Sequence, residues 1–176
     1  MLSTEGWIDI RWAGEEHLAG LVRVHEVCLP RELWSARDFV RFADKPGQVV
    51  KAVVNTETGE VVGSLLTRTD KNACRVARLA VLPGYADDGV PEWVVRHALT
   101  GPTAANRRPV CLVRVREHDV DDQRFWAAVG FRKTETDPAC YDHPTEQGWK
   151  QDGYWFRYDK PEPTRRRRAS RAAAAV

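Results

Sequence analysis

RVARLAVLPGYADDGVPEWVVRHAL, residues 75–99, holds the signals for a strand, a turn and a helix in direct succession. Residues 79–82 are apolar on both alternating faces, which is typical of a strand buried on both sides within a sheet. A Pro-Gly pair ends this strand. Val90, Val94 and Ala98 then recur at four-residue spacing, so we expect an amphipathic helix to follow.

The junction between this strand and this helix is a place where an anion can bind. We expect Asp88 to be the N-cap of the helix and Pro91 to lie in its first turn. The free amide groups and the positive dipole end of the helix would then point at the loop, as phosphate binding requires. Asp87 and Asp88 add negative charge there, which opposes an anionic ligand.

Composition indicates one folded domain followed by a short basic tail. The 176 residues, 43% of them hydrophobic, are enough for one core and too few for two. Residues 161–176 hold five Arg and one Glu, whereas the whole chain carries a formal charge of +2. We therefore expect a domain over residues 1–160 and a disordered tail over 161–176. A basic tail can contact nucleic acid through phosphates, but a solvated chain end is the simpler interpretation.

Several classes of protein are excluded by what the sequence lacks. It has no run of eighteen apolar residues and no signal-peptide pattern, so we expect a cytoplasmic protein that does not span a membrane. The histidines form no H-x-x-x-H pair, and the cysteines form no C-x-x-C pair, so no metal site or disulfide framework is predicted. Monomer and homodimer both remain open. The four cysteines are Cys28, Cys74, Cys111 and Cys140.

Periodicity and turn signals predict seven strands and four helices along the chain. Strands two to four follow one another through short polar turns and should form an antiparallel meander. A helix separates strands four and five, so these two can be parallel. The expected order begins with a strand at 8–12, a helix at 15–29, and a second helix at 36–43 that is capped by Ser35 and Asp38. Strands at 48–55 and 60–68 follow, and then the central strand and helix. The last expected elements are a strand at 110–115, a helix from Asp119 or Asp121 to Gly130, a strand from Phe131, a polar loop at 137–153 and a strand at 154–158.

Three stretches resemble motifs of the GNAT superfamily of N-acetyltransferases. LAVLPGY at 79–85 is similar to the family's L-x-V-x-P-x-Y strand end, and Gly89 matches a glycine of its R/Q-x-x-G-x-G/A pyrophosphate loop. VREHDVDDQRFWAAVGF at 115–131 resembles the second motif, V-R-x-x-N-x-x-A-x-x-x-Y-x-x-x-G-F. LWSARDF at 33–39 is similar to the W-S-x-x-x-F of members that acetylate protein N-termini, including ribosomal-protein alanine acetyltransferases.

The resemblance implies a fold, a reaction and a cosubstrate. The fold is of the α/β (α+β) class, with a mixed, mostly antiparallel sheet of about seven strands, strands four and five parallel, and about four flanking helices. The reaction is transfer of an acetyl group from acetyl-coenzyme A to an amine, with a peptide N-terminus as the favoured acceptor. The implied cofactor-binding residues are Leu79, Ala80, Val81, Ala86, Asp87, Asp88, Gly89, Val90, Pro91, Asp119 and Phe125.

The catalytic positions of the family are altered here. The acid that protonates the leaving thiolate is often the Tyr of the second motif, and Trp126 stands there with an indole N–H that is not acidic near neutral pH. The base is often a Glu before the V-R pair, and Arg114 stands there. Glu117, His118 and Glu26 are candidate substitutes, with a solvated surface residue or a helix cap as the alternative for each.

Two functions therefore remain open. The first is an N-acetyltransferase, which we place ahead because the family tolerates varied catalytic residues. The second is a GNAT-fold domain that has lost catalysis and acts as a ligand sensor or as a partner of protein or nucleic acid. The altered residues Ala86, Pro91, Arg114 and Trp126 favour this second function.

The chain is rich in tryptophan, with seven residues of this type. We interpret them mainly as core and groove lining, because aromatic side chains bury a large area wherever they lie. The alternative is an aromatic-walled ligand groove formed by Trp34, Trp126 and Trp155.

Overall fold

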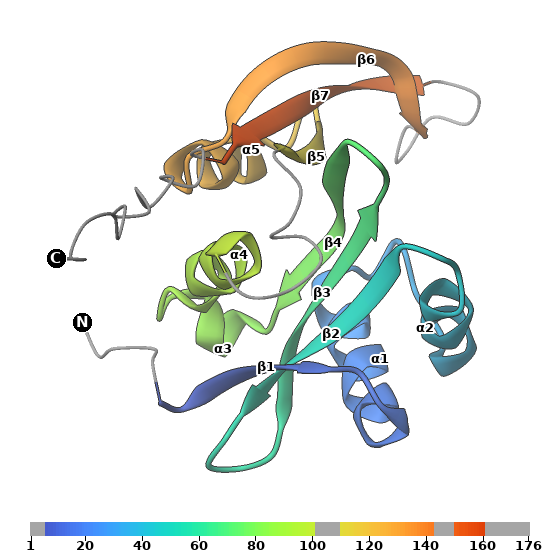
Figure 1. The fold of residues 1–176 in the computed structure, drawn as a ribbon, viewed down its shortest axis with the longest axis vertical. Helices are drawn as coiled ribbons and strands as arrows, with labels where there is room; N and C mark the ends of the chain where they lie inside the picture. The colour runs from blue at the N-terminus through green and yellow to red at the C-terminus, as the bar shows by residue number, and fades with distance from the viewer. Residues whose placement is uncertain (1–5, 101–109, 143–149, 161–176) are drawn as a thin grey trace, which may run out of the picture.

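The computed structural model describes residues 6–100, 110–142 and 150–160, which form a seven-stranded sheet with helices on both faces (Figure 1). The strands are β1 (Ile8–Trp12), β2 (Gln48–Asn55), β3 (Val61–Thr69), β4 (Ala73–Val81), β5 (Val110–Arg116), β6 (Arg132–Asp142) and β7 (Lys150–Asp159). The helices are the 3-10 turn η1 (Glu15–His17), α1 (Leu18–Cys28), α2 (Ala36–Ala43), α3 (Pro83–Ala86), α4 (Val90–Thr100) and α5 (Val120–Ala128).

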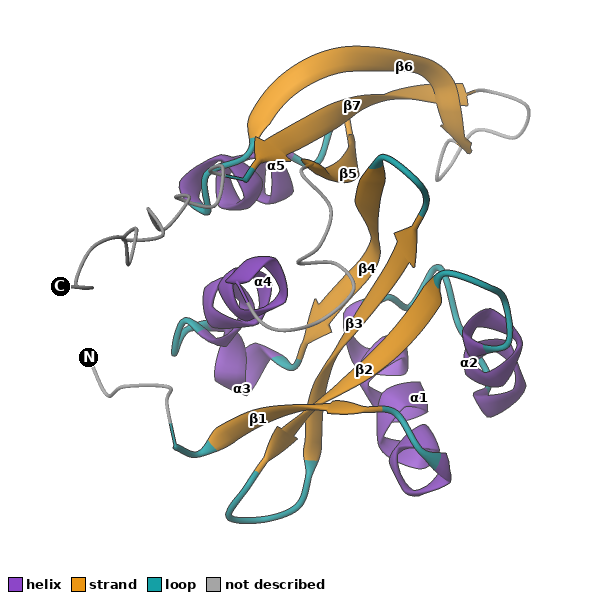
Figure 2. Cartoon of the chain, viewed as in Figure 1, coloured by secondary structure: helices purple, strands orange, loops and turns teal. Residues whose placement is uncertain are grey.

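The strand order across the sheet is β1-β2-β3-β4-β5-β7-β6. Strands β4 and β5 are parallel, and every other neighbouring pair is antiparallel. The predicted fold class is therefore confirmed, including the meander of strands two to four. The structure has one more α-helix than predicted, because residues read as a plain turn form the single-turn helix α3 (Figure 2).

The second helix begins where its capping residues predict. The Ser35 hydroxyl donates a hydrogen bond to the Asp38 carboxylate at 2.6 Å, and the Ser35 backbone N–H donates to the same carboxylate at 2.9 Å. These two hydrogen bonds to Asp38 hold Ser35 as the N-cap residue, so α2 begins one residue later, at Ala36. The first helix differs slightly from the prediction, because residues 15–17 form a 3-10 turn before α1 proper begins.

The N-terminus of α4 corrects one prediction. The helix begins at Val90, and the carbonyl of Gly89 accepts its first hydrogen bond from the Trp93 N–H at 3.1 Å. Gly89, and not Asp88, therefore precedes the helix. The chain reverses between α3 and α4 through the positive φ of Gly89, +76°, which favours glycine over any residue with a Cβ. Pro91 lies in the first turn of α4, as predicted.

The polar loop predicted at residues 137–153 is a second correction. Strands β6 and β7 extend into it from both sides, and Tyr141 pairs with Gln151. A register shift between Asp137 and Tyr141 takes up the turn-forming residues. Within it, Ala139 has a φ of +52° and its N–H donates to the Asp152 carboxylate at 2.8 Å. A bulge of this kind lets a strand continue through residues that read as a loop.

Helices cover both faces of the sheet. Helices α1 and α2 pack on one face through Leu21, Val24, Phe39 and Phe42, and α4 and α5 lie on the other (Figure 1). The predicted stripe of α4 is the buried one, since the exposed fractions of Val90, Val94 and Ala98 are 0%, 0% and 8%. Burying each valine contributes roughly 1.5–3 kcal/mol relative to exposure.

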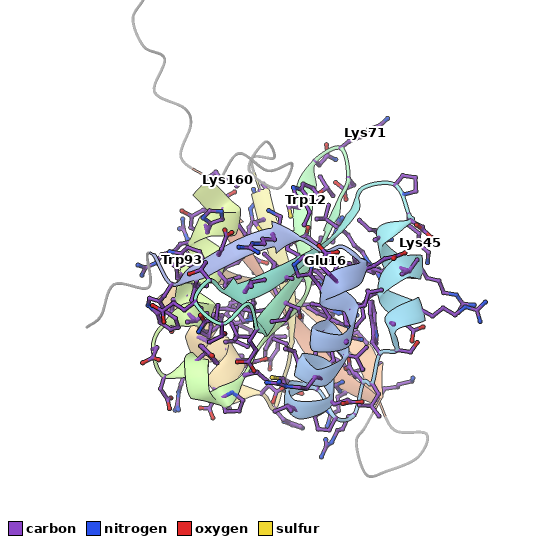
Figure 3. The ribbon with its side chains drawn as sticks, turned by 90° about the horizontal axis from the view of Figure 1, so that it is seen from below. Trp12, Glu16, Lys45, Lys71, Trp93 and Lys160 are labelled. Carbon is purple, nitrogen blue, oxygen red and sulfur yellow. The ribbon has the colours of Figure 1, made fainter. Side chains whose placement is uncertain are left out.

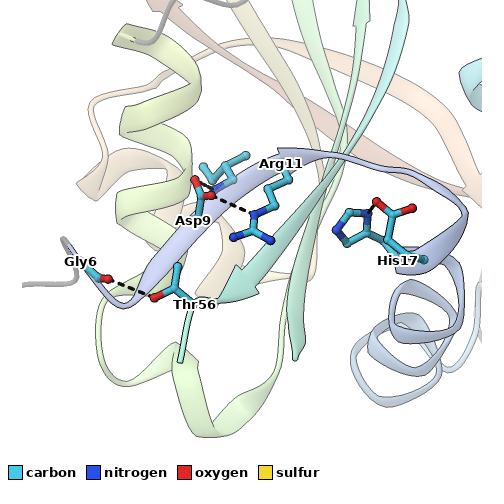
Figure 4. A network of polar contacts seen from close by, with 7 residues as sticks. Gly6, Asp9, Arg11, His17 and Thr56 are labelled. Atoms are coloured by element: carbon cyan, nitrogen blue, oxygen red, sulfur yellow. Dashed lines mark hydrogen bonds and ion pairs between the residues drawn. The ribbon is translucent and has the colours of Figure 1, made fainter. Parts of the chain in front are cut away.

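Strand β1 is the edge strand of the sheet on the side of β2. Its Asp9 and Arg11 form an ion pair at 3.0 Å, and the Thr56 hydroxyl donates to the Gly6 carbonyl at 3.1 Å (Figure 4). Trp12 is 63% exposed, so at least this tryptophan lies outside the core (Figure 3).

Along the described chain, no helix is long and apolar enough to cross a membrane. The four cysteines are free thiols, and the predicted tail at 161–176 lies outside the described residues.

Candidate functional site

A V-shaped cleft opens where β4 and β5 separate. The two strands pair only from Ala73 with Val110 to Val76 with Val113. Beyond that point β4 keeps its pairing with β3, and within the described part of the chain no strand pairs with its other edge up to Val81. A shift in the β3–β4 register leaves Ala77 bulged and exposed at the apex of the cleft.

The free edge of β4 presents backbone groups to the cleft. The Leu82 N–H donates to the Val62 carbonyl at 2.8 Å, which fixes the bonded positions of the β3–β4 pair. Because bonded positions alternate along an antiparallel pair, the N–H and C=O groups of Leu79 and Val81 point away from β3 and into the cleft. The Val81 carbonyl accepts a hydrogen bond there from Cys28 Sγ at 3.2 Å. An extended ligand that carries amide groups can pair with such an edge.

Three adjoining cavities follow this cleft. An entrance cavity of about 480 Å³ lies between the end of α1 and the end of β5, and is bordered by Glu32 and His118. A cleft cavity of about 180 Å³ lies against α5, and is bordered by Leu79, Phe125 and Trp126. A basic cavity of about 340 Å³ lies on the α2 side. The cleft cavity and the basic cavity share Val76, Ala77, Arg78, Arg114 and Tyr141, so they meet at the bulge.

Glu32 spans the mouth of the cleft. Its carboxylate accepts from Arg78 on β4 at 2.5 Å and from Arg116 on β5 at 2.8 Å. Burial raises the pKa of Glu32, but Arg78 and Arg116 together outweigh burial and hold that pKa below its usual range. The ion pairs therefore keep Glu32 charged at neutral pH and leave it a weak base.

Tyr141 was not predicted as a site residue, because it falls in the stretch read as a loop. It borders both the cleft cavity and the basic cavity, and its hydroxyl donates to the Arg114 carbonyl at 3.0 Å. The guanidinium carbons of Arg114 and Arg116 lie 4.9 Å and 4.4 Å from its ring centre. Burial raises the pKa of Tyr141, and Arg114 offsets part of that rise. The sequence signal that could have found it is an aromatic residue beside small ones in a stretch that can form a strand.

The three predicted catalytic residues lie in different surroundings. Glu117 Oε1 accepts a hydrogen bond from the Tyr154 hydroxyl on β7 at 2.9 Å, and its side chain borders none of the three cavities. Glu26 is exposed on α1 and also lies outside them. His118 is exposed and borders the entrance cavity. The structure therefore brings one of these three residues to the cleft.

Trp126 is part of the core and also borders the cleft cavity. It is 4% exposed, and its ring packs edge-on against Phe125 at 5.1 Å and Phe131 at 5.0 Å. Trp34 and Trp155 border the basic cavity. The three tryptophans of the predicted aromatic groove are thus divided between the two cavities that meet at the bulge.

The residues predicted to bind the cofactor lie at the end of β4, in the turn before α4, at the start of α4 and at α5. Ala80 and Val90 are buried, whereas Asp87 and Asp88 are exposed in the turn before α4. The Gly89 N–H already donates to the Ala86 carbonyl at 3.3 Å, and Pro91 has no N–H to offer. Asp119 precedes α5 as its N-cap residue and, with Phe125, borders the cleft cavity. Two positions of this segment, Gly89 and Pro91, therefore offer no free N–H, and two acidic side chains lie beside them.

Comparison with known proteins finds likeness in structure and none in sequence. No family model and no curated protein matches the sequence. Ribosomal-protein-S18-alanine N-acetyltransferase from Escherichia coli matches with a TM-score of 0.70 at 14% identity, over 86% of this chain and 93% of that one. Arabidopsis thaliana NAA60 in complex with acetyl-CoA matches with a TM-score of 0.69 at 15% identity, over 86% and 98%.

A third solved structure shows the same likeness. Ard1 from Thermoplasma volcanium matches with a TM-score of 0.69 at 18% identity, over 88% of this chain and 99% of that one. At such identities the likeness concerns the fold. The parting of β4 and β5, the flanking helices and these whole-length matches together show that the chain has the fold of the GNAT N-acetyltransferases.

Proposed function

We propose that this protein is an N-acetyltransferase that moves an acetyl group from acetyl-coenzyme A to an amine. One observation carries the proposal: the unpaired edge of β4 leads to the bulge at Ala77, where the cleft cavity and the basic cavity meet. A thioester held along that edge and an amine held in the basic cavity would come together at this point. The Escherichia coli neighbour is an N-acetyltransferase and the NAA60 neighbour holds acetyl-CoA, and both support the reaction class.

The cleft fits the pantetheine arm of acetyl-coenzyme A, whose two amides alternate with apolar segments. Backbone groups of Leu79 and Val81 would pair with those amides, as a neighbouring strand would. Phe125 and Trp126 would cover the apolar segments from the α5 side. When bound, acetyl-coenzyme A would supply the activated acetyl group. The Cys28 thiol would give up its weak hydrogen bond to Val81.

At the bulge, the hydroxyl of Tyr141 acts as the acid that protonates the leaving thiolate. The amine nitrogen forms a bond to the acetyl carbon as the carbon–sulfur bond breaks, the amine proton leaves to solvent, and the departing thiolate takes a proton from the Tyr141 hydroxyl. Solvent then restores the phenol proton. Trp126 cannot fill this role, whereas a phenol at the junction of the two cavities can. Glu32 is held by two arginines, so the amine would lose its proton without help from that carboxylate.

A binding module without catalysis is the second candidate, and the turn before α4 favours it. Asp87 and Asp88 are exposed where the resemblance places the pyrophosphate, and each would cost on the order of 1 kcal/mol at about 4 Å in the dielectric of bulk water. Such a domain would bind its ligand in the same cleft and would not transfer an acetyl group.

Calorimetry and a transfer assay together separate these functions. Acetyl-coenzyme A is titrated into the full chain and into Ala77→Trp, which places a large side chain at the bulge. Ala19→Trp, on the exposed surface of α1, is the matched control. We expect weak binding that Ala77→Trp abolishes and Ala19→Trp preserves, with acetyl transfer to a panel of amines and peptide N-termini. Binding without any transfer would support a module that binds acetyl-coenzyme A, and no binding at all would refute both the acetyltransferase and that module.

A further inference from the structure

Arginines dominate the lining of the basic cavity. Of its described lining residues, four are arginines and none is aspartate or glutamate. Three of them, Arg75, Arg78 and Arg114, pair with the carboxylates of Asp70, Glu32 and Asp137, which lie outside the lining. The arginines come from three strands that are consecutive in the sheet, β3, β4 and β5. Its volume of about 340 Å³ lies at the lower end of the range for small-molecule sites. The four residues are Arg68, Arg75, Arg78 and Arg114.

Two of these charges oppose one another across neighbouring strands. Arg68 on β3 and Arg75 on β4 are direct partners in the antiparallel register, so their side chains leave the same face of the sheet. Like charges at directly opposed positions destabilise a sheet. Arg75 is paired with Asp70, whereas Arg68 has no carboxylate partner among the described residues. An anion between the two guanidinium groups would remove this repulsion.

Aromatic rings lie against three of the four guanidinium groups of the cavity. Arg78 lies over the ring of Trp34 at 4.7 Å, and Arg68 lies over the ring of Phe42 at 5.4 Å. Arg114 lies 5.6 Å from the ring centre of Trp155. Stacking covers the faces of a guanidinium group and leaves its N–H edge free for a carboxylate or phosphate oxygen.

We propose that the acceptor is a small primary amine that also carries a carboxylate or phosphonate group. This inference rests on the proposed acetyl transfer and names its substrate class. The anionic group binds between Arg68 and Arg75, and the amine reaches the bulge at Ala77. Arg75 and Ala77 are two residues apart on β4, so their backbone positions lie about 7 Å apart along the strand. An unbranched chain of a few carbons between the anionic group and the nitrogen spans that distance.

Matched pairs of amines test the substrate class. Each pair has the same chain of two to five carbons and ends in either a carboxylate or the corresponding amide, such as 4-aminobutyrate and 4-aminobutanamide. Phosphonate analogues form a third series, and short peptides form a fourth. Binding is measured by calorimetry without acetyl-coenzyme A, and transfer is measured separately. We expect the charged member at the best chain length to bind at least tenfold more tightly than its amide, and less tightly as salt is raised.

Variants at Arg68 test the place where the anion binds. Arg68→Gln should weaken binding of the charged amine roughly tenfold or more, raise its KM by a similar factor, and leave kcat and the binding of the amide unchanged. The substitution removes both the repulsion with Arg75 and the contact with the Phe42 ring, so thermal stability should change little. Arg11→Gln, at the far edge of the sheet on β1 (Figure 4), is the matched control and should leave all of these quantities unchanged.

The outcomes distinguish this inference from the proposed function. Charged amines that bind through Arg68 but are never acetylated would uphold the anion site and refute acetyl transfer. Amides or peptide N-termini acetylated as well as the charged amines, with Arg68→Gln unaffected, would uphold acetyl transfer and refute the inference. The absence of binding by any charged amine would refute the inference as well.

Discussion

Among single residues, Tyr141 offers the most direct test of the proposed chemistry. Tyr141→Phe removes the phenol proton and keeps the ring against Arg114 and Arg116. We expect kcat to fall about a hundredfold, within the usual range for loss of general acid catalysis, with little change in the affinity for acetyl-coenzyme A. Tyr154→Phe, which removes a hydroxyl bonded to Glu117 outside the cavities, is the control. Equal losses in both variants would argue against Tyr141 as the acid.

The buried side chain of His25 should make the stability of the fold depend on pH. It is fully buried, and its Nε2 lies 3.0 Å from the Ser64 hydroxyl. Burial and, to a smaller extent, Arg78 lower the pKa of His25 to about 4 from its usual 6.5. In the unfolded chain this histidine takes up a proton near pH 6.5, and in the folded chain it does not. Stability should therefore be fully retained above that pH and fall as the pH drops from 6.5 towards 4, by up to about 3 kcal/mol.

Urea unfolding at several pH values checks this slope. His25→Leu should flatten the change between pH 6.5 and 4, whatever its effect on stability at pH 7. His118→Gln, at an exposed position, should keep the slope of the unmodified chain. An unchanged slope in His25→Leu would assign the acid sensitivity to other groups.

At the scale of elements, the turn between α3 and α4 should limit the affinity for coenzyme A. Asp87 and Asp88 would repel the pyrophosphate, and Gly89 and Pro91 offer it no free N–H. Calorimetry should give weak binding, and the double change Ala86→Arg with Asp87→Gly should tighten it several-fold. The same charge change made elsewhere, in Ala128→Arg with Asp121→Gly on α5, should have a smaller effect. Micromolar or tighter binding by the unmodified chain would contradict this expectation.

Local signals predicted most of the elements and fewer of the site residues. The capping pair at Ser35 and the spacing from Val90 to Ala98 act within a few residues, so the sequence reveals them. The extension of β6 depends on pairing with β7 across a bulge, which turn-forming residues conceal. Tyr141 reaches the cleft through that same pairing, and this explains why periodicity did not single it out.

The site also depends on contacts between residues distant in sequence. Glu32 meets Arg116 across 84 positions, and Arg68 opposes Arg75 only because β3 and β4 share one register. The family resemblance located the cleft, since the motif at residues 79–85 supplies its β4 wall. It carried no information on the charge of the adjoining basic cavity, which arises from three strands and the segment around α2.

At the scale of the whole molecule, the tail at residues 161–176 should be dispensable for folding. The described sheet and both helical layers are complete by residue 160. Deleting residues 162–176 should therefore leave the melting temperature nearly unchanged. Calorimetric melting of the full and shortened chains measures this. A fall of many degrees would show that the tail packs against the domain.

The short seam between β4 and β5 has a consequence for the order in which parts of the molecule open. Four residue pairs, which include the buried Cys74 and Cys111, join β1–β4 to the sheet half formed by β5, β7 and β6. Cooperative units in native proteins commonly follow such boundaries. Backbone amides of β5 and β7 should therefore exchange with deuterium together, and sooner than those of β2 and β3. A ligand that contacts both sides of the cleft would slow amide exchange in both halves of the sheet, because it would hold the two halves together.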